Sequence, residues 1–415
     1  MQYVIVGAGP SGVTAAETLR DADPEASVVL VDGEKEPPYG RMAIPYFLIG
    51  NVPEEGVYLR KDDNHFENLG ITYIQDRAKS VSHDDNTLTL ESGDVLPFDK
   101  MLVASGSHPV KPPIDGLDHP NVHHCWTLEN ARNIAKITGE GVDVVLMGAG
   151  FIGCIIMEAL ALSGANLTVV EAEDRMVPRM MDQTAGNMIK SWCLEKGVNV
   201  LTSARVTSVD DNDGKLAVNV DNGDIINADL VVVATGVRPN ADFLKDSGVE
   251  IEAGIKVDNN LKSSVDNIYA AGDVAQGPDF STDGWSVHAV QPTGVEHGRT
   301  AALCMAGKDM EYRGSLNMNV LDTLGLISCS FGLWQGVEGG DSAERIDEKN
   351  YRYTLLNFDG DVLVGALMIG RTDSIGVIRG LIQTPVKLGK WKERLMADPN
   401  LFVEAYVDCT RGGDA

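Results

Sequence analysis

The sequence has little positive charge and no long apolar run. Its 34 lysines and arginines stand against 61 aspartates and glutamates, which gives a formal net charge of −27. A field of this sign repels nucleic acid and anionic membrane surfaces, so we expect neither as a partner. No apolar run reaches the ~18 residues that a membrane-spanning helix needs, and the N-terminus lacks the basic and apolar regions of a secretory signal. We therefore expect a cytoplasmic protein, whose acidity suits a saline cytoplasm and an ordinary one alike.

Paired cysteines are also missing. The six cysteines are scattered and form no Cys-x-x-Cys motif, so we expect buried, reduced thiols with no redox disulfide and no zinc site. The adjacent pair His123-His124 has no acidic or cysteine partner at ligand spacing, which favours an ordinary loop over a metal centre.

A strand, glycine turn, helix and second strand open the chain. Residues 2–6 form an apolar strand, and the turn has glycines at positions 7, 9 and 12 around Pro10-Ser11. A helical stretch then runs through Leu19, and the strand at 27–32 ends on Asp32. Glycine lets the backbone turn tightly and approach a pyrophosphate, and a carboxylate about 20 residues later can accept ribose hydroxyls. The order of these features predicts a dinucleotide site.

The same unit returns over residues 143–171. The strand at 143–147 leads into Gly148, Gly150 and Gly153, a helix through Leu162 that begins with Phe151-Ile152, and a strand that ends on Glu171. Because an anionic Glu171 repels a 2′-phosphate, the second site favours NADH over NADPH. Arg175, four residues later, could soften this preference.

Other segments extend the duplication. A strand ending in Ala104-Ser105-Gly106 closes the first region, and one ending in Ala234-Thr235-Gly236 closes the second. A further strand runs into Ala271-Gly272-Asp273. From about Ser315 the pattern changes to strands and a basic helix, which predicts a third domain of roughly 100 residues. The fold class is α/β, with two doubly wound dinucleotide-binding domains and an α+β C-terminal domain.

These motifs and their order resemble the pyridine nucleotide-disulfide oxidoreductase superfamily. The resemblance implies an FAD domain in two segments (1–112 and 240–314), an inserted NAD domain (113–239) and a C-terminal interface domain (315–415). The residues that it implies for FAD are Gly7, Gly9, Pro10, Ser11, Gly12, Asp32, Arg41, Ala104, Ser105, Gly106, Gly272, Asp273 and His297. Those that it implies for NAD are Gly148, Gly150, Phe151, Ile152, Gly153, Glu171 and Gly236.

A missing cysteine indicates which branch of this superfamily the chain resembles. Relatives that use a single redox cysteine place it where this chain has Met42, and the late His-x4-Glu pair of the disulfide reductases is missing too. Without a thiolate, electrons leave the flavin directly. Arg41, the segment 363–370 and the helix around His297 resemble the rubredoxin, ferredoxin and nitrite reductase flavoproteins. One departure is Ile155, which stands where many relatives have a glutamate near the nicotinamide.

The expected reaction is hydride transfer from NADH to FAD, followed by electron transfer to a carrier protein or another acceptor. No side-chain acid or base is certain, and the candidates near the flavin are Tyr46 and His297. Ordinary packing or capping is the alternative for His297. The basic residues Lys387, Lys390, Lys392 and Arg394 are either a docking surface for an acidic carrier or a solvated helix face. The rival functions are an NADH oxidase and a redox-sensing interaction protein, and a homodimer through the C-terminal domain is a further expectation.

Overall fold

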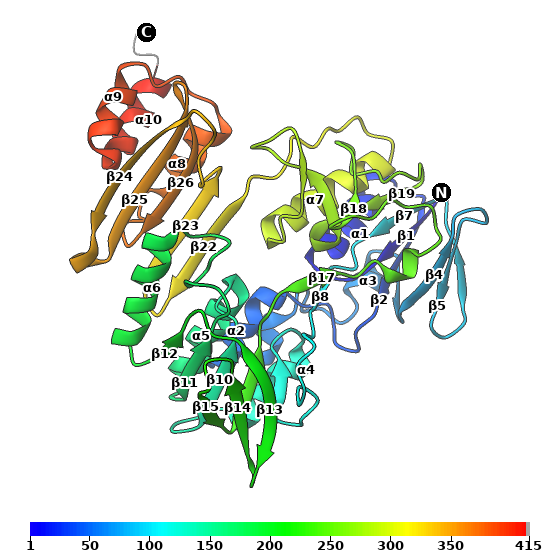
Figure 1. Ribbon diagram of the computed structural model, residues 1–415. Coiled ribbons are helices and arrows are strands. Elements are labelled where there is room, and N and C mark those ends of the chain that lie inside the picture. The colour runs from blue at the N-terminus through cyan, green and yellow to red at the C-terminus, as the bar shows by residue number, and fades with distance from the viewer. Residues whose placement is uncertain (412–415) are drawn as a thin grey trace. The chain divides into compact units, whose positions relative to one another are not determined.

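The computed structural model describes residues 1–411, which fold into two compact units whose elements are labelled in Figure 1. The first unit consists of Met1–Pro109 and Val237–Ser315, and the second consists of Val110–Gly236 and the chain from Leu316 onward. Each unit is therefore built from two separate stretches of sequence.

A five-stranded parallel sheet forms the centre of the first unit, with strand order β19-β7-β1-β2-β3. Val4, Ile5, Leu30 and Leu102 are completely buried in it, as expected for apolar strands covered on both faces. Helices α1 and α7 pack against each other in this unit. The bounds are β1 Gln2–Val6, β2 Ser27–Asp32, β3 Ile71–Gln75, β7 Lys100–Val103, β19 Ile268–Ala270, α1 Pro10–Ala22 and α7 Gln291–Met305.

Short elements complete the first unit. They are β4 Ala78–Ser82, β5 Thr87–Leu90, β6 Val95–Pro97, β8 Ser107–Pro109, β17 Val237–Pro239, β18 Ile255–Lys256, β20 Ala275–Pro278, β21 Trp285–Ser286, α2 Ile44–Leu48 and α3 His65–Asn68. Strands β8 and β17 pair with each other where the chain leaves and re-enters this unit.

The second unit begins with another five-stranded parallel sheet, of order β12-β11-β10-β16-β9. A three-stranded antiparallel sheet, β13-β14-β15, follows it in this part of the chain. The bounds are β9 Val122–His124, β10 Asp143–Met147, β11 Asn166–Val170, β12 Asn199–Leu201, β13 Val206–Asn212, β14 Lys215–Val220, β15 Ile225–Ala228, β16 Leu230–Val233, α4 Leu128–Ile137, α5 Phe151–Leu162 and α6 Gln183–Glu195.

The C-terminal part of the second unit is an antiparallel sheet of order β22-β23-β26-β25-β24 (Figure 1). Helices α8 and α9 pack against this sheet, and α10 packs against α8 and α9. The bounds are β22 Met318–Thr323, β23 Leu326–Gly332, β24 Asp341–Asp347, β25 Arg352–Asp359, β26 Val362–Ile369, α8 Ile375–Gln383, α9 Lys390–Ala397 and α10 Phe402–Thr410.

Helix α6 joins the two parts of the second unit. The indole Nε1 of Trp192 donates to the carbonyl of Thr323 at 3.0 Å, and the Tyr353 hydroxyl donates to Asp182, the N-cap of α6, at 2.7 Å. Burial and the neighbouring Asp182 raise the pKa of Tyr353, so this hydroxyl stays a donor. These two contacts tie α6 to the C-terminal sheet.

The expected fold class is confirmed, and two details differ from the sequence prediction. Helix α1 continues three residues past Leu19, to Ala22. The loop predicted for His123-His124 is wrong, because both residues lie in β9 and pair in parallel with β16. A three-residue edge strand is too short to show a period in the sequence. Within residues 1–411, no helix has the length and apolar character needed to cross a membrane.

Candidate functional site

The first glycine turn requires glycine at two positions for steric reasons. Gly7 has φ +106° and donates its N–H to the carbonyl of Val31 at 2.8 Å, and a Cβ there would overlap the carbonyl of Ala104. A Cβ on Gly12 would overlap the carbonyl of Gly7, so this glycine sets the close packing of helix on strand. At Gly9, by contrast, a Cβ would meet no atom within 4 Å.

The second turn repeats this geometry. Gly148 has φ +100°, donates its N–H to the carbonyl of Val170 at 2.8 Å, and lies against the carbonyl of Ala234. A Cβ on Gly153 would overlap the carbonyl of Gly148, whereas a Cβ on Gly150 would meet nothing within 4 Å. The duplication predicted from sequence therefore extends to the role of each glycine.

Both turns leave open space in front of a helix N-terminus. Gly9 and Gly150 are the N-caps of α1 and α5 and offer no capping side chain. The first backbone N–H groups of each helix are therefore available for an anion, and the helix dipole favours one. Pro10 starts α1 without losing a needed donor, and half-buried Phe151 and Ile152 start α5. The two turns fit the pyrophosphate groups of two dinucleotides.

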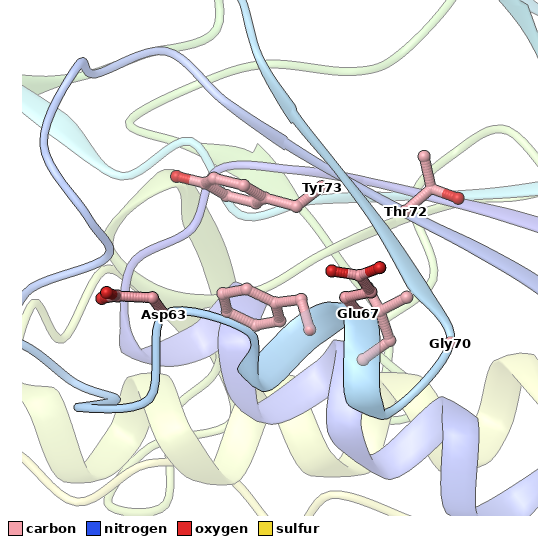
Figure 2. A pocket seen from close by; sticks show the side chains of 7 residues that line it. Asp63, Glu67, Gly70, Thr72 and Tyr73 are labelled. Carbon is pink, nitrogen blue, oxygen red and sulfur yellow. The ribbon is translucent and has the colours of Figure 1, made fainter.

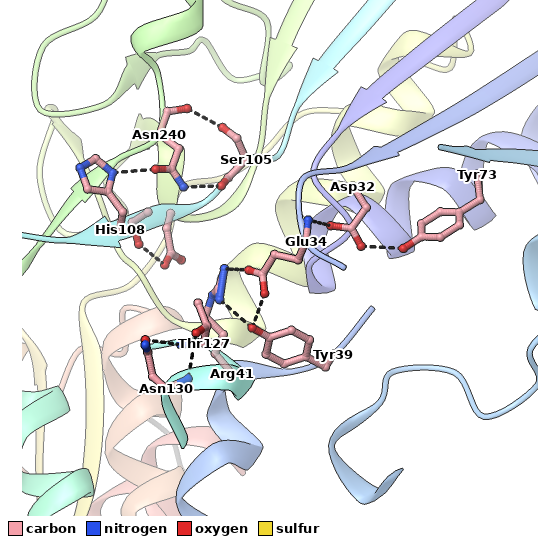
Figure 3. A network of polar contacts seen from close by, with 12 residues as sticks. Asp32, Glu34, Tyr39, Arg41, Tyr73, Ser105, His108, Thr127, Asn130 and Asn240 are labelled. Atoms are coloured by element: carbon pink, nitrogen blue, oxygen red, sulfur yellow. Dashed lines mark hydrogen bonds and ion pairs between the residues drawn. The ribbon is translucent and has the colours of Figure 1, made fainter. Parts of the chain in front are cut away.

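Asp32 ends β2 beside the first turn, with 7% of its surface exposed. Its Oδ2 accepts from the hydroxyl of Tyr73 at 2.7 Å, and its Oδ1 accepts from the N–H of Glu34 at 3.2 Å (Figure 3). Burial raises the pKa of Asp32, and the donation by Tyr73 lowers it in part. The carboxylate is thus fixed in place by two donors.

Arg41 continues the same network. Its guanidinium donates to Glu34 Oε1 at 2.6 Å and to the Tyr39 hydroxyl at 3.2 Å, and Tyr39 donates to the other oxygen of Glu34 at 2.5 Å (Figure 3). Glu34 therefore links the two residues, because its N–H donates to Asp32 and its carboxylate accepts from Arg41.

Glu171 directly follows β11 and is held by backbone groups. Its two oxygens accept from the N–H groups of Ala149 at 2.6 Å and Glu173 at 2.8 Å, and 7% of its surface is exposed. Arg175 donates to the carbonyls of Met181 and Pro178 and pairs with Asp174. Arg175 is therefore engaged by contacts within its own loop.

The segment after β7 is tied down by Asn240. The Ser105 hydroxyl donates to the carbonyl of Asn240 at 2.6 Å, and the Asn240 amide donates to the carbonyl of Ser105 at 2.8 Å (Figure 3). The N–H of Asn240 also donates to the carbonyl of Gly106 at 2.9 Å, and His108 lies 2.6 Å from its side-chain oxygen. The carbonyl of the preceding residue, Ala104, lies against Gly7. The Ser105 hydroxyl thus holds the returning strand.

Gly106 and Gly236 end the two closing strands in the same way. Both have positive φ, +68° and +110°, and neither has an atom within 4 Å of an added Cβ. Glycine adopts such a backbone without the steric cost that a Cβ adds, and the open space lets a ligand approach closely.

Asp273 follows a third turn, at Gly272, whose φ is +76°. Its Oδ2 accepts from the Ser107 hydroxyl at 3.0 Å, and burial raises the pKa of the carboxyl. A Cβ on Gly272 would overlap the hydroxyl of Ser11, which places Ser11 at the contact between α1 and this turn. The first glycine turn and the Gly272-Asp273 turn are therefore neighbours.

His297 lies on α7 and accepts a hydrogen bond from the Gly272 turn. It is 2% exposed, and its Nδ1 accepts from the N–H of Gly272 at 3.4 Å. Burial, together with the nearby His288, lowers the pKa of His297 to about 4. The ring is therefore neutral near pH 7, and it packs edge-on against Tyr312 at 4.7 Å between centroids. Its Nε2 is buried and meets no hydrogen-bond partner among the described residues.

Tyr46 and Met42 lie on exposed positions around α2. The exposed fractions are 55% for Tyr46 and 46% for Met42.

Of the six cysteines, all free, four are buried, and burial raises the pKa of Cys125 and of Cys329 to about 12. Such thiols are not thiolates near pH 7 and are poor nucleophiles. No group of three side chains suited to a metal occurs within residues 1–411.

The basic segment of the C-terminal part is partly neutralised. Lys392 pairs with Asp341 at 2.6 Å, and Lys390 pairs with Asp408 at 3.3 Å. Arg394 lies over the ring of Trp391 at 4.0 Å, and Lys387 precedes α9 and is exposed. The sequence prediction placed all four on one helix, which is wrong for Lys387.

Comparisons with known proteins agree with this arrangement of two dinucleotide turns. A family model described as "Pyridine nucleotide-disulphide oxidoreductase" matches residues 1–294. The NADH-dependent phenylglyoxylate dehydrogenase subunit epsilon of Aromatoleum evansii is 31% identical over 402 residues, which are 96% of this chain and 95% of that protein. An NADH oxidase of Methanocaldococcus jannaschii is 29% identical over 335 residues, covering 77% and 73% of the two chains. The crystal structure of the covalent putidaredoxin reductase–putidaredoxin complex has a TM-score of 0.90 over 98% of both chains, at 22% identity.

Two dinucleotide turns on parallel sheets, together with these similarities, define a pyridine-nucleotide-dependent flavoprotein oxidoreductase. The chain belongs to the pyridine nucleotide-disulphide oxidoreductase family. Its cofactors are FAD and NADH, and the resemblance inferred from the motifs is confirmed.

Proposed function

We propose that the Gly7–Gly12 turn binds FAD and that the Gly148–Gly153 turn binds NADH. The observation that carries this assignment is the paired geometry, in which each turn has one open glycine before an uncapped helix and one buried carboxylate at the end of the next strand. The first turn adjoins the Gly272-Asp273 turn of the same unit, which supports FAD there. The corresponding domains are 1–112 with 240–314 for FAD and 113–239 for NADH.

The residues of the chain act by binding and orientation. The helix N-termini hold the pyrophosphates, Asp32 and Glu171 accept ribose hydroxyls, and Asp273 is held by Ser107 toward the FAD site. When bound, FAD accepts a hydride from NADH and releases electrons singly or in pairs. His297 holds the Gly272 turn as a neutral acceptor, because its pKa of about 4 leaves the ring uncharged near pH 7.

NADH is the proposed donor in preference to NADPH. A buried Glu171 repels a 2′-phosphate, and Arg175 makes three contacts within its own loop that hold it away from a compensating role. The arginine that could soften the preference is thus already occupied.

The proposed acceptor of electrons is a protein carrier or a partner subunit, reached without a cysteine relay. Met42 carries no thiol, and the thiols of Cys125 and Cys329 are buried. The relative from A. evansii is named as a subunit of a larger dehydrogenase, and a relative from Rhodococcus erythropolis, 29% identical, is named rhodocoxin reductase. Electrons can run in either direction through such a site, as the potentials of the partners dictate.

An oxidase is the second candidate, because relatives from M. jannaschii and Enterococcus faecalis, 29% and 26% identical, are named NADH oxidases. Anaerobic flavin reduction by NADH, followed by separate addition of oxygen and of a ferredoxin or rubredoxin, distinguishes the two. Fast reoxidation by the carrier and slow reoxidation by oxygen supports the carrier reaction. The reverse order supports the oxidase.

A cytoplasmic location and a homodimer through the C-terminal part, residues 315–415, stay predictions.

Replacement of each cysteine by serine is expected to leave flavin reduction and reoxidation unchanged. The reason is that electrons leave the flavin without forming a bond to sulfur. Single-turnover absorbance changes at the flavin band check this for the six variants. One variant that binds FAD normally but has lost reoxidation would contradict the proposal.

Charge neutralisation of Lys387 and Arg394 to glutamine is expected to slow reoxidation by an acidic carrier severalfold at low salt. These two cations lack the carboxylate pairs of Lys390 and Lys392, so they contribute most of the free positive charge of this segment. Flavin reduction by NADH is the internal control and should keep its rate. Equal slowing of both half-reactions would argue against docking at this segment.

A further inference from the structure

The carboxylates at the carboxyl ends of β2 and β11, Asp32 and Glu171, are held by different groups. Glu171 reaches back to the N–H of Ala149 in its own glycine turn, and both of its donors are backbone groups. Asp32 is one methylene shorter and takes one donor from a side chain, the hydroxyl of Tyr73, in addition to the N–H of Glu34. The first site thus depends on a residue for which the second site has no counterpart.

Tyr73 occupies a defined place in the first sheet. It lies on β3 opposite Leu30 of β2, two residues before Asp32. The matching place in the second sheet, opposite Val169 on β11, is taken by Val200 on β12. The aromatic hydroxyl is therefore a specific addition to the first site and is not dictated by the sheet.

The ring of Tyr73 is fixed from the other side by Phe66. The two rings stack at 5.2 Å between centroids with 17° between their planes, and Phe66 is 7% exposed. Both residues line an open hollow of about 450 Å³, in which Figure 2 labels Tyr73. The residues that line the hollow are Asp63, Phe66, Glu67, Gly70, Ile71, Thr72 and Tyr73. Since the ring is anchored on Phe66, its hydroxyl stays directed at Asp32.

We propose that Tyr73 is a positioning residue of the FAD site, whose hydroxyl holds Asp32 oriented and ionised to accept the hydroxyls of the adenosine ribose. The inference rests on the proposed binding of FAD at this turn. An ionised carboxylate has about four acceptor positions. Tyr73 and the N–H of Glu34 use one position on each oxygen, which leaves one on each oxygen for the two ribose hydroxyls.

The protonation states agree with this role. Burial raises the pKa of Asp32 toward the range where it would lose its charge, and Tyr73 opposes that shift. Burial and the adjacent Asp32 raise the pKa of Tyr73 well above its usual range, so Tyr73 remains a donor. Without the hydroxyl, Asp32 would take up a proton at higher pH and would then lose acceptor capacity.

The test is Tyr73→Phe in the full chain, with FAD binding to the apoprotein measured by quenching of flavin fluorescence. We expect affinity to fall about tenfold at pH 7, as for loss of a hydrogen bond to a charged group. Acid-induced release of FAD should begin at higher pH than in the unmodified protein. The matched control is Tyr3→Phe, because Tyr3 also donates to an aspartate, Asp23 at 3.0 Å, but on a different strand, β1. That control should keep both the affinity and the pH of release.

The Asp32→Asn variant distinguishes the role of Tyr73 from the role of Asp32 itself. If Tyr73 acts through Asp32, Tyr73→Phe should weaken FAD binding in the native background and add no further loss in Asp32→Asn. Additive losses, equal losses in the Tyr3 control, or an unchanged pH of release would overturn the role of Tyr73. An Asp32→Asn variant that binds FAD normally would instead refute the assignment of Asp32 itself.

Discussion

Replacing Gly150 by valine is expected to slow flavin reduction by NADH about 100-fold while bound FAD stays in place, since small displacements of a reacting pair have effects of this size. Gly150 has extended backbone angles, φ −73° and ψ −172°, that valine adopts freely. An added Cβ meets no atom of the chain within 4 Å, so the fold should accept it. The side chain would occupy the space that a pyrophosphate needs at the N-terminus of α5. Stopped-flow absorbance of the flavin measures the rate.

The companion variant is Gly9→Val, which makes the same change in the other turn, where a Cβ also meets nothing within 4 Å. We expect this protein to be isolated without FAD and with a normal far-ultraviolet circular dichroism spectrum. Dithionite, which needs no nucleotide site, should reduce the flavin of Gly150→Val at the rate of the unmodified protein. If Gly150→Val loses FAD and Gly9→Val keeps it, the two cofactor assignments must be exchanged.

Replacing Gly298 by alanine is expected to lower the free energy of unfolding by about 3 kcal/mol, the upper part of the range for overpacking a core. Gly298 is buried on α7, and an added Cβ would overlap the carbonyl of Ser11 on α1. The obstacle is backbone rather than a flexible side chain, so the two helices must move apart. Because α1 begins at the first glycine turn, we also expect weaker retention of FAD.

The matched control for Gly298→Ala is Gly376→Ala. Gly376 is also helical, on α8, but it is exposed and an added Cβ meets nothing within 4 Å. Alanine there should leave the stability unchanged or raise it by up to about 1 kcal/mol, from helix propensity alone. Thermal and denaturant unfolding of the FAD-free proteins compares the two. Similar stability in both variants would mean that the α1–α7 contact relaxes at little cost.

Much of the fold could be predicted because its signals are local. The glycine turns follow apolar strands directly, and the strand bounds 2–6, 27–32 and 143–147 were predicted to the residue. The C-terminal sheet was recognised only as a change of pattern near Ser315, since antiparallel strand order depends on pairing at a distance. Strand β9 could not be predicted, because its three residues are too few to show an alternating pattern.

The supporting residues of the site could not be predicted, because their partners are far away in sequence. Tyr73 lies 41 residues from Asp32, and Asn240 lies 135 residues from Ser105. The sequence placed Ser105 at the FAD and gave Asn240 no role, whereas the structure shows the two bonded to each other. An isolated tyrosine in a strand or an asparagine after a proline gives no local signal for such contacts.

The pairing of β8 with β17 has a consequence for how such a chain can arise. Pro109 lies opposite Val237, and the N–H of Val110 donates to the carbonyl of Gly236 at 2.9 Å, so the first and last residues of the stretch 110–236 are adjacent. An ancestral gene encoding one nucleotide-binding unit could therefore accept a copy of itself at this point without separating the ends of its own strands. The same adjacency makes the stretch exchangeable, so that evolution, or a protein engineer, can graft a nucleotide unit of different specificity between Pro109 and Val237.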